Sequence, residues 1–124
     1  MSHDGAEYIF RDPRYVIAEG QQTFVELRRD DDPAAPPISS LLVDLSRKGM
    51  QILADVSLEI GEKITVFLRE PSAELEVQLS GKVQWQRGAD DQQFVIGCQF
   101  AEDVNWEVLG ELFLSGILDQ KTAV

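Results

Sequence analysis

Apolar and polar residues alternate along several short segments of this chain, which is the pattern of strands that bury one face. The longest such segment is residues 74–86, where the apolar parity carries Leu75, Val77, Leu79, Val83 and Trp85. Gly81 falls on the same parity without a side chain, which favours a bend or bulge where a sheet curls. A long, half-buried strand is therefore predicted here.

Four further regions have strand patterns. They are residues 23–27, two runs within 42–53, residues 63–68 and residues 94–100. In the last of these, Cys98 belongs to an inward apolar row, so we interpret it as a buried apolar residue without a catalytic role. Residues 28–40 contain three prolines and three consecutive aspartates, which predict a solvated loop.

Near the C-terminus the period of the apolar residues lengthens to that of a helix. The stripe consists of Trp106, Leu109, Leu112, Phe113 and Ile117. A helix is predicted over residues 105–118, with either Asp103 or Asn105 as its N-cap. We expect this stripe to seal one end or side of the molecule, and any part left uncovered to form a homodimer surface. Together the elements predict an all-β fold, a small antiparallel barrel with a C-terminal α-helix.

The segment 42–53, LVDLSRKGMQIL, joins two apolar runs through a compact polar centre. In a strand, Asp44 and Ser46 lie on one face, and the aliphatic residues Val43 and Leu45 lie on the other. Gly49 can adopt a positive φ, so the chain can turn there and return as a hairpin. The turn also carries two cations, Arg47 and Lys48. On spacing alone, an ordinary surface hairpin explains these residues equally well.

Composition narrows the class of function. The chain has 124 residues, 44% of them hydrophobic, and a net charge of -11. It has one cysteine, no apolar run long enough to cross a bilayer and no signal-peptide pattern, so we expect a single cytoplasmic domain without membrane insertion. A strongly acidic chain repels polynucleotides and anionic membranes. A small anion can bind only where cations gather, as in the pairs Arg11 with Arg14, Arg28 with Arg29, and Arg47 with Lys48.

The sequence offers little support for catalysis. The sole histidine, His3, lies in residues 1–9, which we expect to be a mobile tail, so the commonest general base is missing from the ordered part of the chain. The run Asp30–Asp32 lacks the alternate spacing of a calcium loop. We therefore expect no enzyme activity, no metal and no cofactor.

Residues 10–16, FRDPRYV, form a candidate anion-binding arm. Pro13 disfavours helix at the preceding residue, so the segment is extended or turned. Arg11 and Arg14 flank this stiffened pair, and arginine offers forked donors suited to phosphates. A solvated arm with incidental charges is the alternative.

The stretch VDLSRKGMQI resembles the second motif of PilZ domains, Asp/Asn-x-Ser-x-x-Gly between two strands. Leu58-x-Ile60-Gly61, the segment 81–85 and the segment 94–100 before a helix are also similar, in the same order. The resemblance covers nearly the whole chain as a single domain. It implies a six-stranded β-barrel over residues 23–100 that binds the bacterial second messenger cyclic di-GMP. It also implies control of motility, biofilm exopolysaccharide or surface attachment.

Carried over residue by residue, the resemblance assigns Asp44, Ser46 and Gly49 to the ligand-binding hairpin. The family's N-terminal motif, Arg-x-x-x-Arg, is altered. Only two residues separate Arg11 from Arg14, so if Arg14 is the second arginine, Phe10 stands at the first position. If Arg11 is instead the first arginine, Tyr15 stands at the second position. The order Arg14-Tyr15-Val16 before the first strand favours the former alignment. Arg11 then supplies a displaced guanidinium, or Phe10 stacks on a base.

Two hypotheses follow from this departure. In the first, the protein is a cyclic di-GMP sensor that transmits the binding signal to an unidentified partner protein. The positive charges of Arg47 and Lys48 then add an electrostatic field that favours the anionic ligand. In the second, it is a divergent PilZ domain that binds no nucleotide. It then acts as a protein–protein adaptor through its acidic exterior and its C-terminal helix.

Overall fold

The computed structural model describes residues 14–17, 23–70 and 74–122. Its elements, in chain order, are β1 (Tyr15–Ile17), β2 (Phe24–Arg29), β3 (Ile38–Leu45), β4 (Gly49–Ala54), β5 (Lys63–Glu70), β6 (Leu75–Gly88), the 3-10 turn η2 (Asp90–Gln92), β7 (Phe94–Phe100), α2 (Trp106–Leu114) and β8 (Leu118–Thr122). No helix within these ranges is long and apolar enough to span a membrane.

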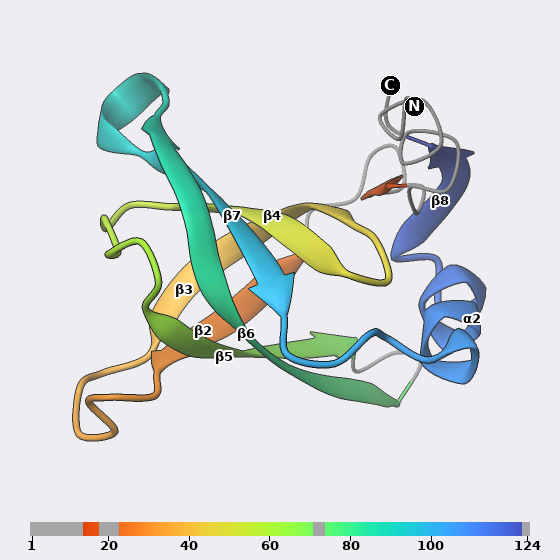
Figure 1. Ribbon diagram of the computed structural model, residues 1–124. Coiled ribbons are helices and arrows are strands. Elements are labelled where there is room, and N and C mark those ends of the chain that lie inside the picture. Colours follow the sequence, from red (N-terminus) through yellow and green to blue (C-terminus); the bar gives the residue numbers. More distant parts are fainter. Residues whose placement is uncertain (1–13, 18–22, 71–73, 123–124) are drawn as a thin grey trace, which may run out of the picture.

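Six of the strands close into a barrel. Neighbours pair antiparallel in the order β2-β5-β6-β7-β4-β3, and β2 also pairs with β3, which completes the circle. The short strand β1 pairs with the end of β3, and β8 pairs with β1, so these two extend the sheet beyond the barrel (Figure 1). The predicted six-stranded antiparallel barrel with a C-terminal helix is confirmed.

Aliphatic side chains from alternate positions fill the interior. The largest fully buried ones include Leu27, Leu45, Ile52, Ile64, Leu68 and Ile96. Cys98 is buried among them, and burial raises the pKa of its thiol to about 12 because the thiolate would lose its hydration. The thiol is therefore uncharged at neutral pH, in keeping with the apolar role expected from the sequence.

A bulge in β3 alters the predicted alternation. Pairing with β4 passes from Leu42 opposite Ile52 to Asp44 opposite Gln51, which leaves Val43 as the extra residue. The prediction that Val43 shares the inner face with Leu45 was therefore wrong, and its side chain is 39% exposed. Such an extra residue lets Leu42 and Leu45 both face the core although they are three positions apart.

A second bulge lies in β6. Its pairing with β7 shifts between Val83 and Trp85. Val83 is buried, but Trp85 leaves the inward row in which its parity had placed it and lies on the outer face. Gly81, the residue expected to mark the irregularity, is regularly paired with both neighbouring strands.

Two glycines permit a close approach of strands instead of a turn. Gly49 was expected to use a positive φ, but the described glycines with positive φ are Gly61 and Gly116. A Cβ on Gly49 would lie 2.3 Å from the carbonyl oxygen of Cys98, and one on Gly81 would lie 2.3 Å from that of Gln99. Both positions therefore require glycine because the neighbouring backbone occupies the space of a side chain.

The C-terminal helix is shorter than predicted. Asn105 is the N-cap, since its side-chain oxygen accepts a hydrogen bond from the Val108 N–H at 2.8 Å. The helix ends at Leu114 and not at residue 118, because Gly116 adopts a φ of 83° and closes the last turn. The chain then continues as strand β8, which the sequence analysis did not predict.

The apolar stripe of this region is divided between the core and the surface. Leu109 and Leu112 are buried, and Phe113 contacts Tyr15 edge to face at 4.8 Å between ring centroids. Ile117 is also buried, but it lies beyond the helix. Trp106, which was expected in the stripe, is exposed.

We predict that one glycine of β6 tolerates substitution by alanine and that another does not. Gly81→Ala places a Cβ against the backbone of β7 and is expected to lower the free energy of unfolding by about 1–3 kcal/mol, the usual cost of overpacking. Gly88→Ala meets no atom within 4 Å and serves as the matched control. Urea denaturation measures both, and equal stabilities would contradict the close approach.

Candidate functional site

A pocket of about 460 Å³ lies on the outer face of the barrel. Strand register explains its floor: Asp44 pairs with Gln51, Gln51 pairs with Gly97, and Gly97 pairs with Trp85. These four residues form one row across β3, β4, β7 and β6. The bulges in β3 and β6 lie at the two ends of this row. The remaining lining residues are Arg14, Ser46, Lys48, Gly49, Met50, Gln84, Cys98 and Gln99.

Asp44 is the one buried charged residue in the part of the chain that the structure describes, at 6% exposure. Its Oδ2 accepts a hydrogen bond from Gln51 Nε2 at 3.0 Å. Among the described residues its ion-pair partner is Arg14, whose Nη1 lies 4.0 Å from the same oxygen. Within the described residues, Gln51 and Arg14 do not offset the hydration that this buried carboxylate has lost, because burial remains the largest influence on its pKa.

This environment perturbs the titration of Asp44. Burial raises the pKa of the carboxyl above its usual value, while the Arg14 charge and a hydrogen bond from Gln51 act in the opposite direction. Burial is the largest of the three effects. A buried carboxyl with a raised pKa in a pocket is typical of functional sites, because fold stability alone does not favour it.

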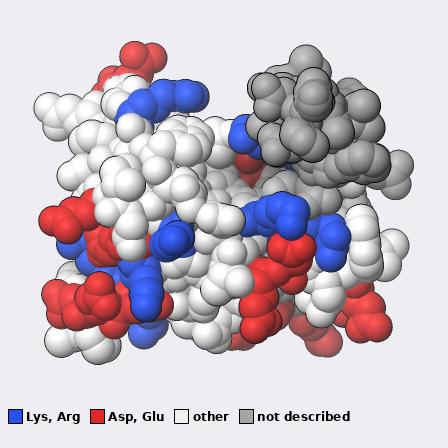
Figure 2. All heavy atoms as spheres, viewed as in Figure 1, with Lys and Arg blue, Asp and Glu red and all other residues white. Residues whose placement is uncertain are grey.

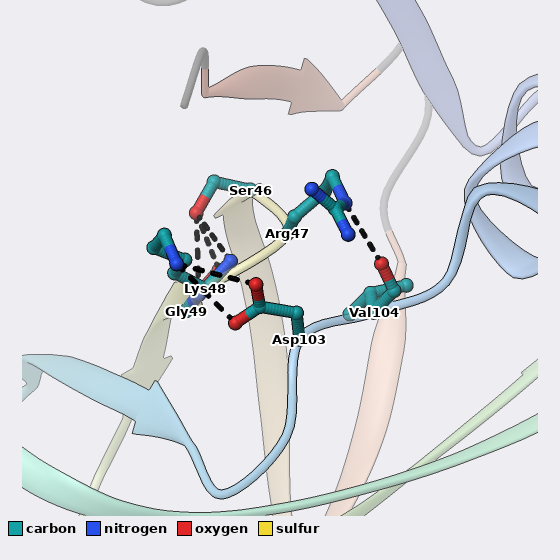
Figure 3. A network of polar contacts seen from close by, with 6 residues as sticks. All are labelled: Ser46, Arg47, Lys48, Gly49, Asp103 and Val104. Atoms are coloured by element: carbon teal, nitrogen blue, oxygen red, sulfur yellow. Dashed lines mark hydrogen bonds and ion pairs between the residues drawn. The ribbon is translucent and has the colours of Figure 1, made fainter. Parts of the chain in front are cut away.

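Ser46 shapes the turn between β3 and β4. Its Oγ accepts hydrogen bonds from the backbone N–H groups of Lys48 and Gly49, each at 3.2 Å. Its own N–H donates to the Gly49 carbonyl oxygen at 2.8 Å (Figure 3). The hydroxyl therefore closes the turn and orients the backbone that edges the pocket.

The two cations of the turn contact the segment before α2. Arg47 Nε donates to the Val104 carbonyl oxygen at 3.1 Å, and its guanidinium lies 4.4 Å from the centre of the Trp106 ring. Lys48 Nζ pairs with Asp103 at 3.2 Å (Figure 3). The turn that edges the pocket is thus joined directly to residues 103–106.

The sequence analysis missed the far wall of the pocket. The indole of Trp85 lies over Gly97, where a Cβ would be 2.2 Å from the ring. Beside it, the Gln84 amide donates to the side-chain oxygen of Gln99. The residues of this wall lie in two segments, 81–85 and 94–100, that also carry the resemblance to PilZ domains, and this resemblance could have indicated them.

The structure brings together five of the eight residues expected at the site, namely Arg14, Asp44, Ser46, Lys48 and Gly49. Arg47 reaches the α2 segment instead, and Phe10 and Arg11 lie outside the described residues. On the face in Figure 2, basic atoms lie beside acidic ones and form no single broad positive surface. No cluster of three or more His, Cys, Asp or Glu suited to a metal occurs within the described ranges.

Fold and pocket together define a closed antiparallel β-barrel with a polar pocket on its outer face, and the family comparison agrees with this class of fold. The model of the PilZ domain matches residues 11–113, so this chain belongs to the PilZ family, whose members are binding domains and generally non-catalytic. No curated protein sequence matches the chain significantly.

Solved structures share the fold at low identity. The PilZ domain of YcgR from Escherichia coli, solved with c-di-GMP, has 16% identity and a TM-score of 0.63 over 86% of this chain and 89% of that chain. PlzA of Borreliella burgdorferi, in complex with c-di-GMP, has 13% identity and a TM-score of 0.59, with 91% of this chain and 44% of that chain covered. The Bacillus subtilis inhibitor of motility MotI/DgrA has 14% identity and a TM-score of 0.58, with coverages of 85% and 48%. The chain therefore spans under half of the latter two.

We predict that ionisation of Asp44 lowers the free energy of unfolding as the pH rises above 3.8, the reference pKa of an aspartate. Between that value and the raised pKa of the folded carboxyl, the native state binds more protons than the unfolded state, so increasing pH favours unfolding. Asp44→Asn removes this dependence. The stability of the variant minus that of the wild type should rise with pH and level off above the folded pKa.

Urea denaturation of both proteins from about pH 3 to about pH 7 measures this difference, in which the other carboxylates cancel. A difference that falls with pH would mean that Arg14 and Gln51 outweigh burial.

Proposed function

We propose that this protein is a sensor that binds cyclic di-GMP in the pocket between Arg14 and the row Asp44–Gln51–Gly97–Trp85. The observation that carries the proposal is the buried carboxylate of Asp44 on the pocket floor, which contacts Gln51 and lies 4.0 Å from Arg14. Two structural relatives were solved with this nucleotide. Their likeness bears on the fold, so the assignment rests on the residues themselves.

Asp44 and Arg14 supply complementary chemistry for a guanine nucleotide. The carboxylate accepts hydrogen bonds from N–H donors, which the edge of a guanine base offers. The guanidinium of Arg14 is about half exposed. It can donate two hydrogen bonds to the O6 and N7 acceptors of a guanine base, or it can contact a phosphate. Ligand donors would also replace hydration that Asp44 has lost on folding, which lowers its pKa on binding.

Trp85 supplies the apolar surface of the same site. Its ring lies against Gly97 and lines the pocket, and the Arg87 guanidinium lies 5.3 Å from its centre, so a base that stacks on the ring would take the place of Arg87. Gly97 makes room for the ring of Trp85, and Gly49 makes room for the backbone of β7, so neither position adds a side chain to the pocket. Lys48 lies at the edge of the pocket, where its charge favours a phosphate.

The β3–β4 turn provides a route from the ligand to a partner protein. Ser46 orients the backbone of the turn, and Arg47 and Lys48 tie the turn to residues 103–106. A ligand that draws Lys48 toward a phosphate competes with Asp103 for it. Binding in the pocket would then alter the segment that leads into α2.

The altered arginine motif favours a second candidate function, an adaptor that binds no nucleotide. Phe10 stands where the family pattern has its first arginine, so one guanidinium is missing or displaced. The acidic exterior and α2 would then serve a protein partner in the absence of any ligand.

We predict micromolar or tighter binding of cyclic di-GMP by isothermal titration calorimetry. Arg14→Ala should weaken binding by roughly tenfold to a hundredfold, because a charged hydrogen bond contributes about 1.5–3 kcal/mol. Asp44→Asn should weaken it through the lost carboxylate, and Trp85→Ala through lost stacking.

Arg28→Ala is the matched control. It removes the same charge from β2, where Arg28 pairs with Glu26 outside the pocket. Equal effects of Arg14→Ala and Arg28→Ala would exclude Arg14 from the site. No heat from the wild type at high protein concentration would reject the sensor and leave the adaptor.

A further inference from the structure

Helix α2 carries an apolar stripe that is largely exposed in the described structure, with Arg47 against the Trp106 ring at its first residue. Trp106 is 63% exposed and Leu114 is 90% exposed, and they are two of the five exposed large hydrophobic residues among those described. With Gly110 between them, they recur every fourth position and lie on one face of the helix. The opposite face, through Leu109 and Leu112, packs into the core.

Gly110 has no explanation within the fold. A Cβ built on it meets no atom within 4 Å, so the interior does not require glycine there. Its φ is not positive, so alanine could adopt the same backbone conformation. A mid-helix glycine costs roughly 1 kcal/mol relative to alanine. Between two large apolar side chains it forms a gap in which a second helix can approach closely, since the distance between packed helices depends on the side chains at their contact.

Acidic residues border the stripe along its length. Glu107 and Glu111 are exposed one position beyond Trp106 and Gly110, and neither has an ion-pair partner within the described ranges. The helix has no basic residue. The exposed surface of α2 is therefore apolar on one side and negative on the other.

We propose that the surface formed by Trp106, Gly110 and Leu114 with Glu107 and Glu111 docks a basic amphipathic helix of a partner protein. Such a helix would set its apolar residues against the stripe and its lysines or arginines against the two glutamates. Electrostatic repulsion disfavours a second copy of this chain as the occupant. Two molecules of net charge -11 would bring two negatively charged helices together.

The docking surface adjoins the pocket of the proposed function without depending on it. Arg47, next to Ser46 in the β3–β4 turn, lies 4.4 Å from the centre of the Trp106 ring. In Figure 1 this turn faces α2. Trp106 is thus both the first apolar residue of the docking surface and a direct contact of the turn that edges the pocket.

The test uses fluorescence anisotropy of labelled synthetic helices at trace concentration, titrated with the full chain at physiological salt. Each peptide has about three heptads with leucine at a and d, and carries lysine, glutamine or glutamate at e and g. The lysine peptide should bind roughly threefold to tenfold more tightly than the glutamine peptide, as expected for a few exposed ion pairs. The glutamate peptide should bind most weakly.

Two variants of unchanged charge separate docking from general attraction to an acidic protein. Leu114→Gln removes the most exposed anchor, and Gly110→Gln fills the gap while favouring the helix. Each should weaken binding of the lysine peptide at least fivefold without lowering the unfolding midpoint. Glu107→Lys with Glu111→Lys should reverse the preference between the lysine and glutamate peptides.

Three outcomes would overturn the proposal. The first is no saturable binding of the lysine peptide up to about 1 mM, a limit far weaker than a specific contact. The second is binding that both glutamine variants retain in full. The third is a dimer in sedimentation experiments that Leu114→Gln abolishes, which would assign the surface to a second copy. None of these measurements involves cyclic di-GMP, so they succeed or fail apart from the sensor proposal.

Discussion

The structure depends on how the barrel accommodates Asp44, a carboxylate held out of water on the outer face of β3. Its position follows from the bulge at Val43, which turns the side chain beside Gln51 while both flanking leucines remain in the core. Among the described residues, hydrogen bonding from Gln51 and an arginine at 4.0 Å compensate the charge only in part, since burial still raises the pKa of the carboxyl. The fold thus carries an unfavourable buried charge at the β3 end of the row that forms the pocket floor, and a ligand that donates hydrogen bonds would relieve this cost.

The β3–β4 turn connects this row to the rest of the molecule. The Ser46 hydroxyl satisfies two backbone donors of the turn, and the absence of a side chain at Gly49 brings the turn close to β7. Arg47 and Lys48 then extend to residues 103–106 on the other side. The hairpin therefore does more than present functional groups, because it links a pocket to the only α-helix of the described chain.

The C-terminal region shows how one element can serve two surfaces. Its inner face closes part of the core through Leu109 and Leu112, while its outer face leaves Trp106 and Leu114 in solvent. Gly116 ends the helix early and allows β8 to return along β1, close to Arg14. The strand pair and the helix thereby lie together beside the barrel (Figure 1).

Local patterns determined much of this protein. Alternation placed the strands, the helical period placed α2, and the order of short motifs indicated the PilZ family and five residues that line one pocket. Other features depended on contacts between distant strands. Trp85 has the parity of a core residue, and only the bulge in β6 moves it to the outer face above Gly97. Likewise, Gly49 and Gly81 are fixed by carbonyl groups of β7, and β8 exists because β1 supplies a partner. Periodicity reports which residues are apolar, whereas bulges and close backbone approaches depend on how neighbouring strands pair, which only the tertiary structure decides.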